Sequence, residues 1–125
     1  MKLPTSVAGW LGSLLLAGAA TAAPSPALDG PASAEQFVQV CANELALTEQ
    51  QRSGLLAYLE QEMNYLAVQR ANHTAAEVAQ LLPAERQEFQ RVAGRLMSPT
   101  QLRRFRELEA TPKMQEYLRQ MELAR

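Results

Sequence analysis

Apolar residues recur every three or four positions through most of the chain, which is the spacing of one face of a helix. Phe37, Val40, Cys41 and Leu45 form the first such stripe. After position 33 Ala, Leu, Glu, Gln and Arg dominate, and no stretch alternates apolar and polar residues as a half-buried strand does. The pattern predicts an all-α domain with helices over 34–46, 49–71, 75–81, 83–96, 99–110 and 112–123.

The starts of these helices are marked by a hydroxyl residue with Gln or Glu three positions later, the pattern of a capping box. A further hydroxyl, Thr111, precedes Pro112. The stretch 69–74, "QRANHT", is the best candidate for a sharp turn that folds the long second helix back. We therefore expect a small antiparallel helical hairpin or bundle of about four to six helical segments. Its core would be modest, and dimerisation could complete it. The boxes are Ser33 with Gln36, Thr48 with Gln51, Thr74 with Glu77, and Ser98 with Gln101.

The first 22 residues have the three parts of a secretory signal peptide in the usual order. A short start with Lys2 is followed by the apolar run "VAGWLGSLLLAGAA" and by the small residues Ala20, Thr21 and Ala22. The alternative is a retained membrane anchor, but glycines interrupt the run and it is short for a membrane span. We expect an exported protein with no stable membrane insertion after cleavage.

The segment that follows, residues 23–32, contains Pro24, Pro26, Pro31 and a glycine. This composition predicts a flexible linker. The chain then divides into a signal peptide at 1–22, the linker at 23–32 and a helical domain at 33–125.

Charge is distributed unevenly along the chain. Residues 24–82 carry two basic and seven acidic side chains, whereas residues 83–125 carry nine basic and six acidic ones. An acidic half beside a basic half suits antiparallel pairing or a polar dimer. The formal net charge of the whole chain is −1, so nucleic acid is a poor partner despite the cluster of Arg103, Arg104 and Arg106.

The sequence contains no recognisable set of catalytic residues. The single histidine, His73, excludes a His-pair metal site, and a dyad with Cys41 would lack a third group to orient it. The glutamate pairs 60/62 and 107/109 are two positions apart, which points them in different directions on a helix, so we interpret them as surface charges. We expect no enzymatic activity and no cofactor.

Cys41 is the lone cysteine, so no disulfide can form within the chain. It is interpreted as a small buried residue, with an intermolecular disulfide or a metal-binding thiol as alternatives. Together with His73 and the methionines, it leaves open a small periplasmic metal-binding or metal-resistance protein. The methionines lie on apolar stripes, however, where this adaptable side chain usually fills a core or an interface.

Two segments fifty residues apart repeat one pattern. "LTEQQ" occupies 47–51 and "MSPTQ" occupies 97–101. They resemble the paired LTxxQ motifs of the Spy/CpxP family. The first copy matches at Leu47, Thr48 and Gln51. The second copy matches at Met97, Ser98 and Gln101, with Met and Ser in place of Leu and Thr. The resemblance covers about 33–115. The local explanation, two ordinary capping boxes, accounts for the same residues.

The resemblance implies a small helical protein of the bacterial periplasm that binds other proteins. Members of the family act as ATP-independent chaperones or envelope-stress adaptors, holding unfolded proteins or docking on the periplasmic domain of a sensor kinase. Adaptable apolar side chains beside arginines would suit such a surface, and our candidate contact residues are Met63, Leu66, Arg103, Phe105 and Arg106. A homodimer is expected on the same grounds. A helical interaction module of unrelated ancestry is the remaining alternative.

Overall fold

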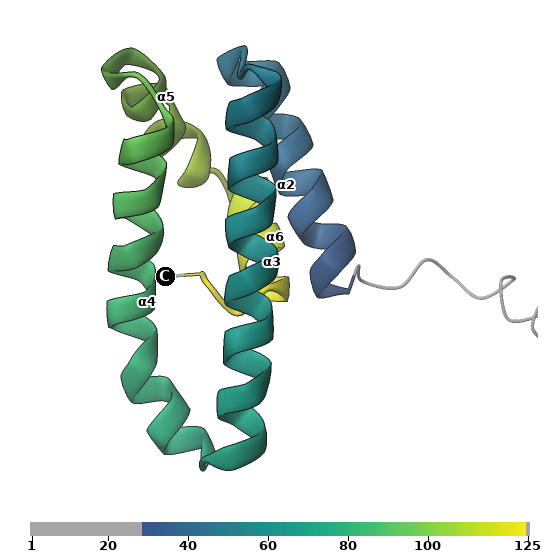
Figure 1. The fold of residues 1–125 in the computed structure, drawn as a ribbon, viewed down its shortest axis with the longest axis vertical. Helices are drawn as coiled ribbons and strands as arrows, with labels where there is room; N and C mark the ends of the chain where they lie inside the picture. Colours follow the sequence, from purple (N-terminus) through teal and green to yellow (C-terminus); the bar gives the residue numbers. More distant parts are fainter. Residues whose placement is uncertain (1–28, 125) are drawn as a thin grey trace, which may run out of the picture.

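The computed structural model describes residues 29–124, and within that range the chain forms five α-helices and no strand (Figure 1). The predicted all-α class is therefore confirmed. The predicted signal peptide lies outside the described residues, as does the linker up to residue 28. The helices are α2 (Gly30–Leu45), α3 (Glu49–Asn72), α4 (Ala75–Leu96), α5 (Pro99–Glu109) and α6 (Pro112–Gln120).

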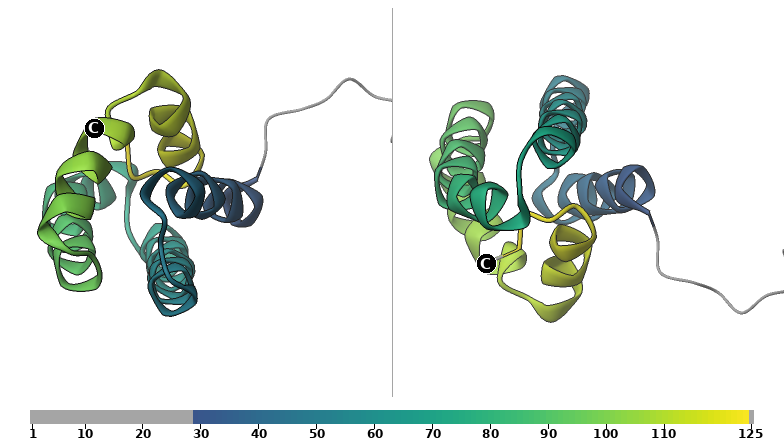
Figure 2. Two further views of the ribbon diagram at one scale, coloured as in Figure 1. Left: turned by 90° about the horizontal axis from the view of Figure 1, so that it is seen from above. Right: turned by 90° about the horizontal axis from the view of Figure 1, so that it is seen from below.

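The two longest helices, α3 and α4, form an antiparallel hairpin that turns at residues 73–74 (Figure 1). The first helix, α2, packs against α3, α5 and α6, and α5 also contacts α4. Seen along the hairpin, the five helices surround a common centre, with α4 and α2 on opposite sides (Figure 2). The fold is thus a hairpin whose upper part is covered by the three shorter helices.

The core is built around three phenylalanines from three helices. Phe37 of α2, Phe89 of α4 and Phe105 of α5 are at most 1% exposed. Their ring centroids lie 5.9–6.2 Å apart in tilted or edge-to-face arrangements, which aromatic pairs favour. Tyr58 of α3 stacks on Phe89 at 5.9 Å with an interplanar angle of 4°. Four helices are therefore joined through one aromatic cluster.

The first helix begins earlier than the sequence predicts. Asp29 is its N-cap, and the Asp29 carboxylate accepts a hydrogen bond of 2.8 Å from the Ala32 N–H. Residues 30–32 of the expected linker therefore belong to α2. Ser33, the expected cap, is fully buried inside the helix, and its hydroxyl makes no hydrogen bond within residues 29–124. An aspartate two positions before Pro31 is typical of a helix N-cap, but interpreting residues 23–32 as a linker left it unrecognised.

Helix α4 runs through Pro83, where two separate helices were predicted. A proline ring removes the hydrogen bond to the carbonyl four residues earlier, here that of Ala79. Both Pro83 and Ala79 are exposed, so water can satisfy the freed carbonyl. The first turns of α4 incline toward α3 while the remainder stands upright (Figure 1), as expected when a proline bends a helix without ending it.

The last helix ends sooner than predicted, at Gln120. Glu122 takes the left-handed conformation with φ 65°, and the Leu123 N–H donates back to the Leu118 carbonyl at 2.7 Å. This is the usual way in which a helix end satisfies its last carbonyls. Leu123 is 2% exposed, so the chain after α6 returns to the core, where Arg86 of α4 binds the Ala124 carbonyl at 3.1 Å.

Candidate functional site

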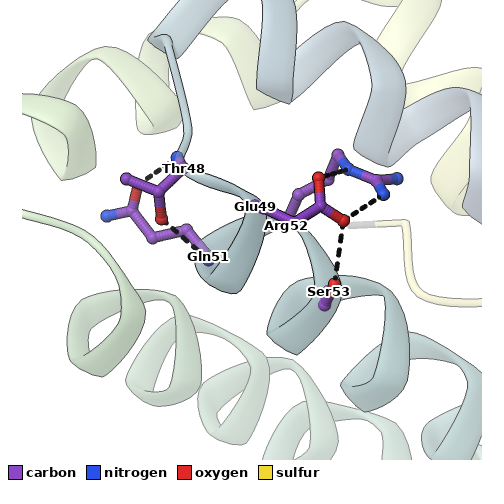
Figure 3. A network of polar contacts seen from close by, with 5 residues as sticks. All are labelled: Thr48, Glu49, Gln51, Arg52 and Ser53. Atoms are coloured by element: carbon purple, nitrogen blue, oxygen red, sulfur yellow. Dashed lines mark hydrogen bonds and ion pairs between the residues drawn. The ribbon is translucent and has the colours of Figure 1, made fainter.

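The first motif segment connects α2 to α3. Ala46 ends α2 in the left-handed conformation with φ 53°, and the Leu47 N–H donates to the Ala42 carbonyl at 3.2 Å. The Thr48 hydroxyl then accepts from the Gln51 N–H at 3.1 Å, while the Thr48 N–H donates to Gln51 Oε1 at 2.9 Å (Figure 3). Both halves of the capping box are formed.

A small surface network follows the first motif. The Glu49 carboxylate accepts hydrogen bonds from Arg52 and Ser53 on the next turn of α3 (Figure 3). The hydrogen bond from Arg52 lowers the pKa of Glu49, and the charge of Arg52 acts in the same direction. These side chains point away from Gln51 in Figure 3, so the network belongs to the solvated side of the helix.

The second motif segment connects α4 to α5 in the same way. The Ser98 hydroxyl accepts from the Gln101 N–H at 3.1 Å, and the Ser98 N–H donates to Gln101 Oε1 at 2.9 Å. Pro99 occupies the first turn, where its missing N–H costs nothing. Met97, before the cap, is 7% exposed and joins the core.

The two motif glutamines are hydrogen-bonded to each other. Gln51 Nε2 donates to Gln101 Oε1 at 2.8 Å, and Gln101 Nε2 donates to Gln51 Oε1 at 3.3 Å. Each amide also reaches a helix end: Gln51 Nε2 donates to the Leu96 carbonyl at 2.9 Å and Gln101 Nε2 to the Leu45 carbonyl at 3.2 Å. Thr48, Gln51, Ser98 and Gln101 are called the motif junction below.

The motif junction uses the whole hydrogen-bonding capacity of both amides. Each Nε2 has two hydrogens and donates twice, and each Oε1 accepts from its own cap N–H and from the other glutamine. The glutamines thereby satisfy carbonyls at the C-terminal ends of α2 and α4, which lack partners within their own helices. Two capping boxes become one tertiary contact across a separation of 50 residues.

A third capping box shows what the same local motif does alone. At the start of α4 the Thr74 hydroxyl accepts from the Glu77 N–H at 3.2 Å, and the Thr74 N–H donates to Glu77 Oε1 at 2.9 Å. That backbone hydrogen bond lowers the pKa of Glu77. Both residues are exposed at the hairpin turn, and the other groups that interact with Glu77 come from His73 and Thr74. Tertiary pairing is therefore a property of the motif junction and not of the capping box.

The five candidate contact residues fall into three groups by exposure. Arg103 and Arg106 lie on the exposed face of α5, and neither side chain makes a hydrogen bond or an ion pair with another described residue. Leu66 and Phe105 are fully buried, which corrects the expectation that they lie on a contact surface. Their apolar side chains are required by the core. Met63 is half-buried against the core, with its sulfur close to Gly30.

Two groups of residues were missed at the sequence level. Tyr65 and Val68 of α3 are 40% and 55% exposed, an unusual position for large apolar side chains. Conversely, Glu62 and Glu109 are 6% and 3% exposed, so the interpretation of both as surface charges was wrong. The spacing of Glu62 indicated its burial, because it lies three residues after Leu59 on the buried stripe of α3.

The possible metal ligands are not gathered. Cys41 is a free, fully buried cysteine, and burial raises the pKa of its thiol to about 12, with a smaller contribution from the charge of Glu109. His73 lies in the exposed hairpin turn, with Nδ1 3.5 Å from Glu77 Oε1. Across residues 29–124 no three side chains of His, Cys, Asp or Glu are grouped so that they could hold a metal ion.

None of the helices between residues 29 and 124 combines the length and apolar character that crossing a membrane requires. In comparisons with known proteins, no family model, no curated protein and no solved structure matches the chain.

Proposed function

We propose that this chain is a Spy/CpxP-like periplasmic protein that binds unfolded or partly folded proteins without ATP. The second protein-binding role that we propose is that of an envelope-stress adaptor, which docks on the periplasmic domain of a sensor kinase. The observation that supports the proposal is the motif junction, because Gln51 and Gln101 act as a pair. Two unrelated capping boxes would not need that pairing.

A client-binding surface requires charges that are free to attract a chain. Arg103, Arg104 and Arg106 of α5 are exposed and are not engaged by acidic side chains of residues 29–124. Other arginines of the molecule already have partners, as Arg52 has in Glu49 and Arg70 in Glu122. The α5 cluster is therefore the best candidate for the first electrostatic encounter with an acidic segment.

Holding a client also requires exposed apolar surface. Tyr65 and Val68 are three positions apart on α3 and supply the large exposed apolar side chains of the described residues. Once the client is bound, burial of apolar area stabilises the complex by a free energy of about 25 cal/mol per Å² removed from water. We assign attraction to the arginines of α5 and retention to this apolar pair.

The test is an aggregation assay with the mass in solution measured alongside. A chemically unfolded client is diluted into buffer with the purified protein and no ATP, and light scattering is followed. We expect roughly equimolar protein to slow aggregation. Loss of two charges in Arg103→Gln/Arg106→Gln should weaken this effect, whereas Lys113→Gln/Arg119→Gln, which removes the same charge from α6, should retain it.

The apolar pair has its own comparison. Tyr65→Ser/Val68→Ser should abolish retention, whereas Ala67→Ser/Ala71→Ser on exposed positions of the same helix should not. If the protein suppressed aggregation of none of several clients and captured no sensor domain, the proposal would be wrong. Equal losses in the test and control variants would refute the assignment of these surfaces.

A further inference from the structure

A hollow of about 480 Å³ lies between α3 and α4, beside the aromatic cluster to which Tyr58 belongs. It is lined by Tyr58, Gln61, Glu62 and Tyr65 of α3 and by Glu85 of α4. Tyr58, Glu62 and Tyr65 follow one another at intervals of four and three positions, and Gln61 adjoins Glu62, so all four lie along one side of α3. These five residues are called the α3–α4 pocket.

The pocket contains two polar atoms that form no hydrogen bond of normal length within residues 29–124. Glu62 is 6% exposed, yet neither its Oε2 nor Tyr58 Oη has a partner within hydrogen-bonding distance among the described residues, although the Glu62 side chain lies near enough to those of Tyr58 and Glu85 to interact with both. An unsatisfied buried polar group costs about 1–3 kcal/mol, and more if it is charged. Such groups are rare in folded proteins, and a bound ligand is one arrangement that would satisfy them. Both atoms belong to residues that line the hollow.

The charges around the pocket are unbalanced. Burial raises the pKa of Glu62 to about 8, and the nearby Glu85 carboxylate adds to the rise. Burial, followed by the charge of Glu62, also raises the pKa of the Tyr58 phenol. Among the described residues, Arg91 of α4 is a basic group that acts on Tyr58, and it is itself paired with Glu88. A ligand with a positive charge would let Glu62 ionise beside the Glu85 carboxylate.

The lining favours an organic cation over a metal ion. Calcium takes six to eight oxygen ligands, more than the two carboxylates of the pocket supply, and magnesium gives up its water ligands reluctantly, so it would gain little from a lining that includes the ring of Tyr65. An ammonium or guanidinium group instead needs a few hydrogen-bond acceptors and apolar surface for the carbon atoms attached to it. Glu62 Oε2 is such an acceptor, and the ring of Tyr65, 40% exposed, provides apolar surface.

We propose that the α3–α4 pocket binds the ammonium or guanidinium group of an organic cation between the carboxylates of Glu62 and Glu85. The cation is either a small free amine or the side chain of a lysine or arginine on a bound chain. Gln61 provides a further acceptor through its side-chain oxygen, and Tyr58 stays fixed by its stacking on Phe89. The site would operate whether or not the protein holds unfolded clients.

Calorimetry with agmatine, which carries both groups, tests the proposal directly. At pH 7 binding should release close to one proton, because Glu62 must ionise, and affinity should rise between pH 6 and pH 8. Titration in two buffers of different ionisation enthalpy measures the proton. E62Q should bind at least tenfold more weakly and release no proton. E60Q, an exposed neighbour on the same helix, should behave as the unmodified protein.

Further titrations separate the possible sources of the cation. Binding of agmatine alone indicates a free amine, and binding of an unstructured lysine- and arginine-containing peptide alone indicates a side chain; either supports the proposal if E62Q abolishes it. Binding of neither overturns it, as does Glu62-dependent binding of Mg²⁺ without binding of either cation. E85Q provides a second test if E62Q fails to fold, and equal weakening in E85Q and E60Q would also overturn it.

Discussion

Replacing a motif glutamine should cost far more than replacing a cap hydroxyl. Four hydrogen bonds involve the Gln51 side chain: to the Leu96 carbonyl, to and from Gln101, and from the Thr48 N–H. A hydrogen bond contributes about 0.5–1.5 kcal/mol net, and water can replace some of these at a half-exposed site. We therefore expect Gln51→Ala to lower the free energy of unfolding by about 2–3 kcal/mol, through loss of these four bonds.

The pairing itself can be isolated with a double-mutant cycle. Gln51→Ala and Gln101→Ala each remove the two bonds between the amides, so the double variant loses those bonds once and not twice. The cost of the double variant should be smaller than the summed single costs by about 1–2 kcal/mol. The measurement is urea unfolding followed by circular dichroism at one fixed pH.

The third capping box provides the matched control. Glu77 occupies the same position in its box as Gln51 and Gln101 do, but it lacks the tertiary pairing. The costs of Gln51→Ala and Glu77→Ala should therefore add to within about 0.5 kcal/mol. If the glutamine pair were equally additive, the motif junction would contribute no coupling and the two motifs would be independent helix starts.

Three further results are expected. Thr48→Ala and Ser98→Ala should each lower the free energy of unfolding by about 1 kcal/mol in urea unfolding, because each removes one side-chain cap; unchanged stability would contradict the capping role. Because the pKa of Glu62 is raised in the folded state, the folded protein binds one more proton than the unfolded chain between about pH 4.5 and about pH 8. The free energy of unfolding should therefore fall as pH rises through this range. E62Q should show a smaller fall in unfolding titrations across the same range. The thiol of Cys41 should react with an aromatic disulfide reagent only when the protein is unfolded, and rapid labelling of the folded protein would show that the site opens.

Much of the fold was predictable because the signals are local. The starts of α3, α4 and α5 are fixed by a hydroxyl and a carboxamide or carboxylate three residues later, and those bonds form within one turn of helix. Proline was less informative, because its effect on a helix depends on whether the freed carbonyl is exposed. Pro83 was expected to separate two helices, but its position on the solvent side of α4 lets the helix continue.

The candidate site was harder to predict because it depends on contacts between distant segments. That Gln51 and Gln101 resemble each other is visible in the sequence, but their mutual hydrogen bonds require the end of α4 to lie beside the start of α3. Likewise, the sequence does not show whether Phe105 faces solvent or the core. Phe105 is buried because α2 packs against α5. Periodicity identifies an apolar face and leaves its partner unspecified.

The location of the motif junction also determines where the hairpin can open. Its hydrogen bonds join the start of α3 to the end of α4, at the opposite end from the turn (Figure 1). Near the turn, residues 70–77 are all exposed, so little tertiary packing resists local fraying there. Amide hydrogen exchange should therefore be fastest around the turn and slow progressively toward Gln51 and Leu96. The far end of the hairpin can loosen and adapt its shape while the other end stays closed.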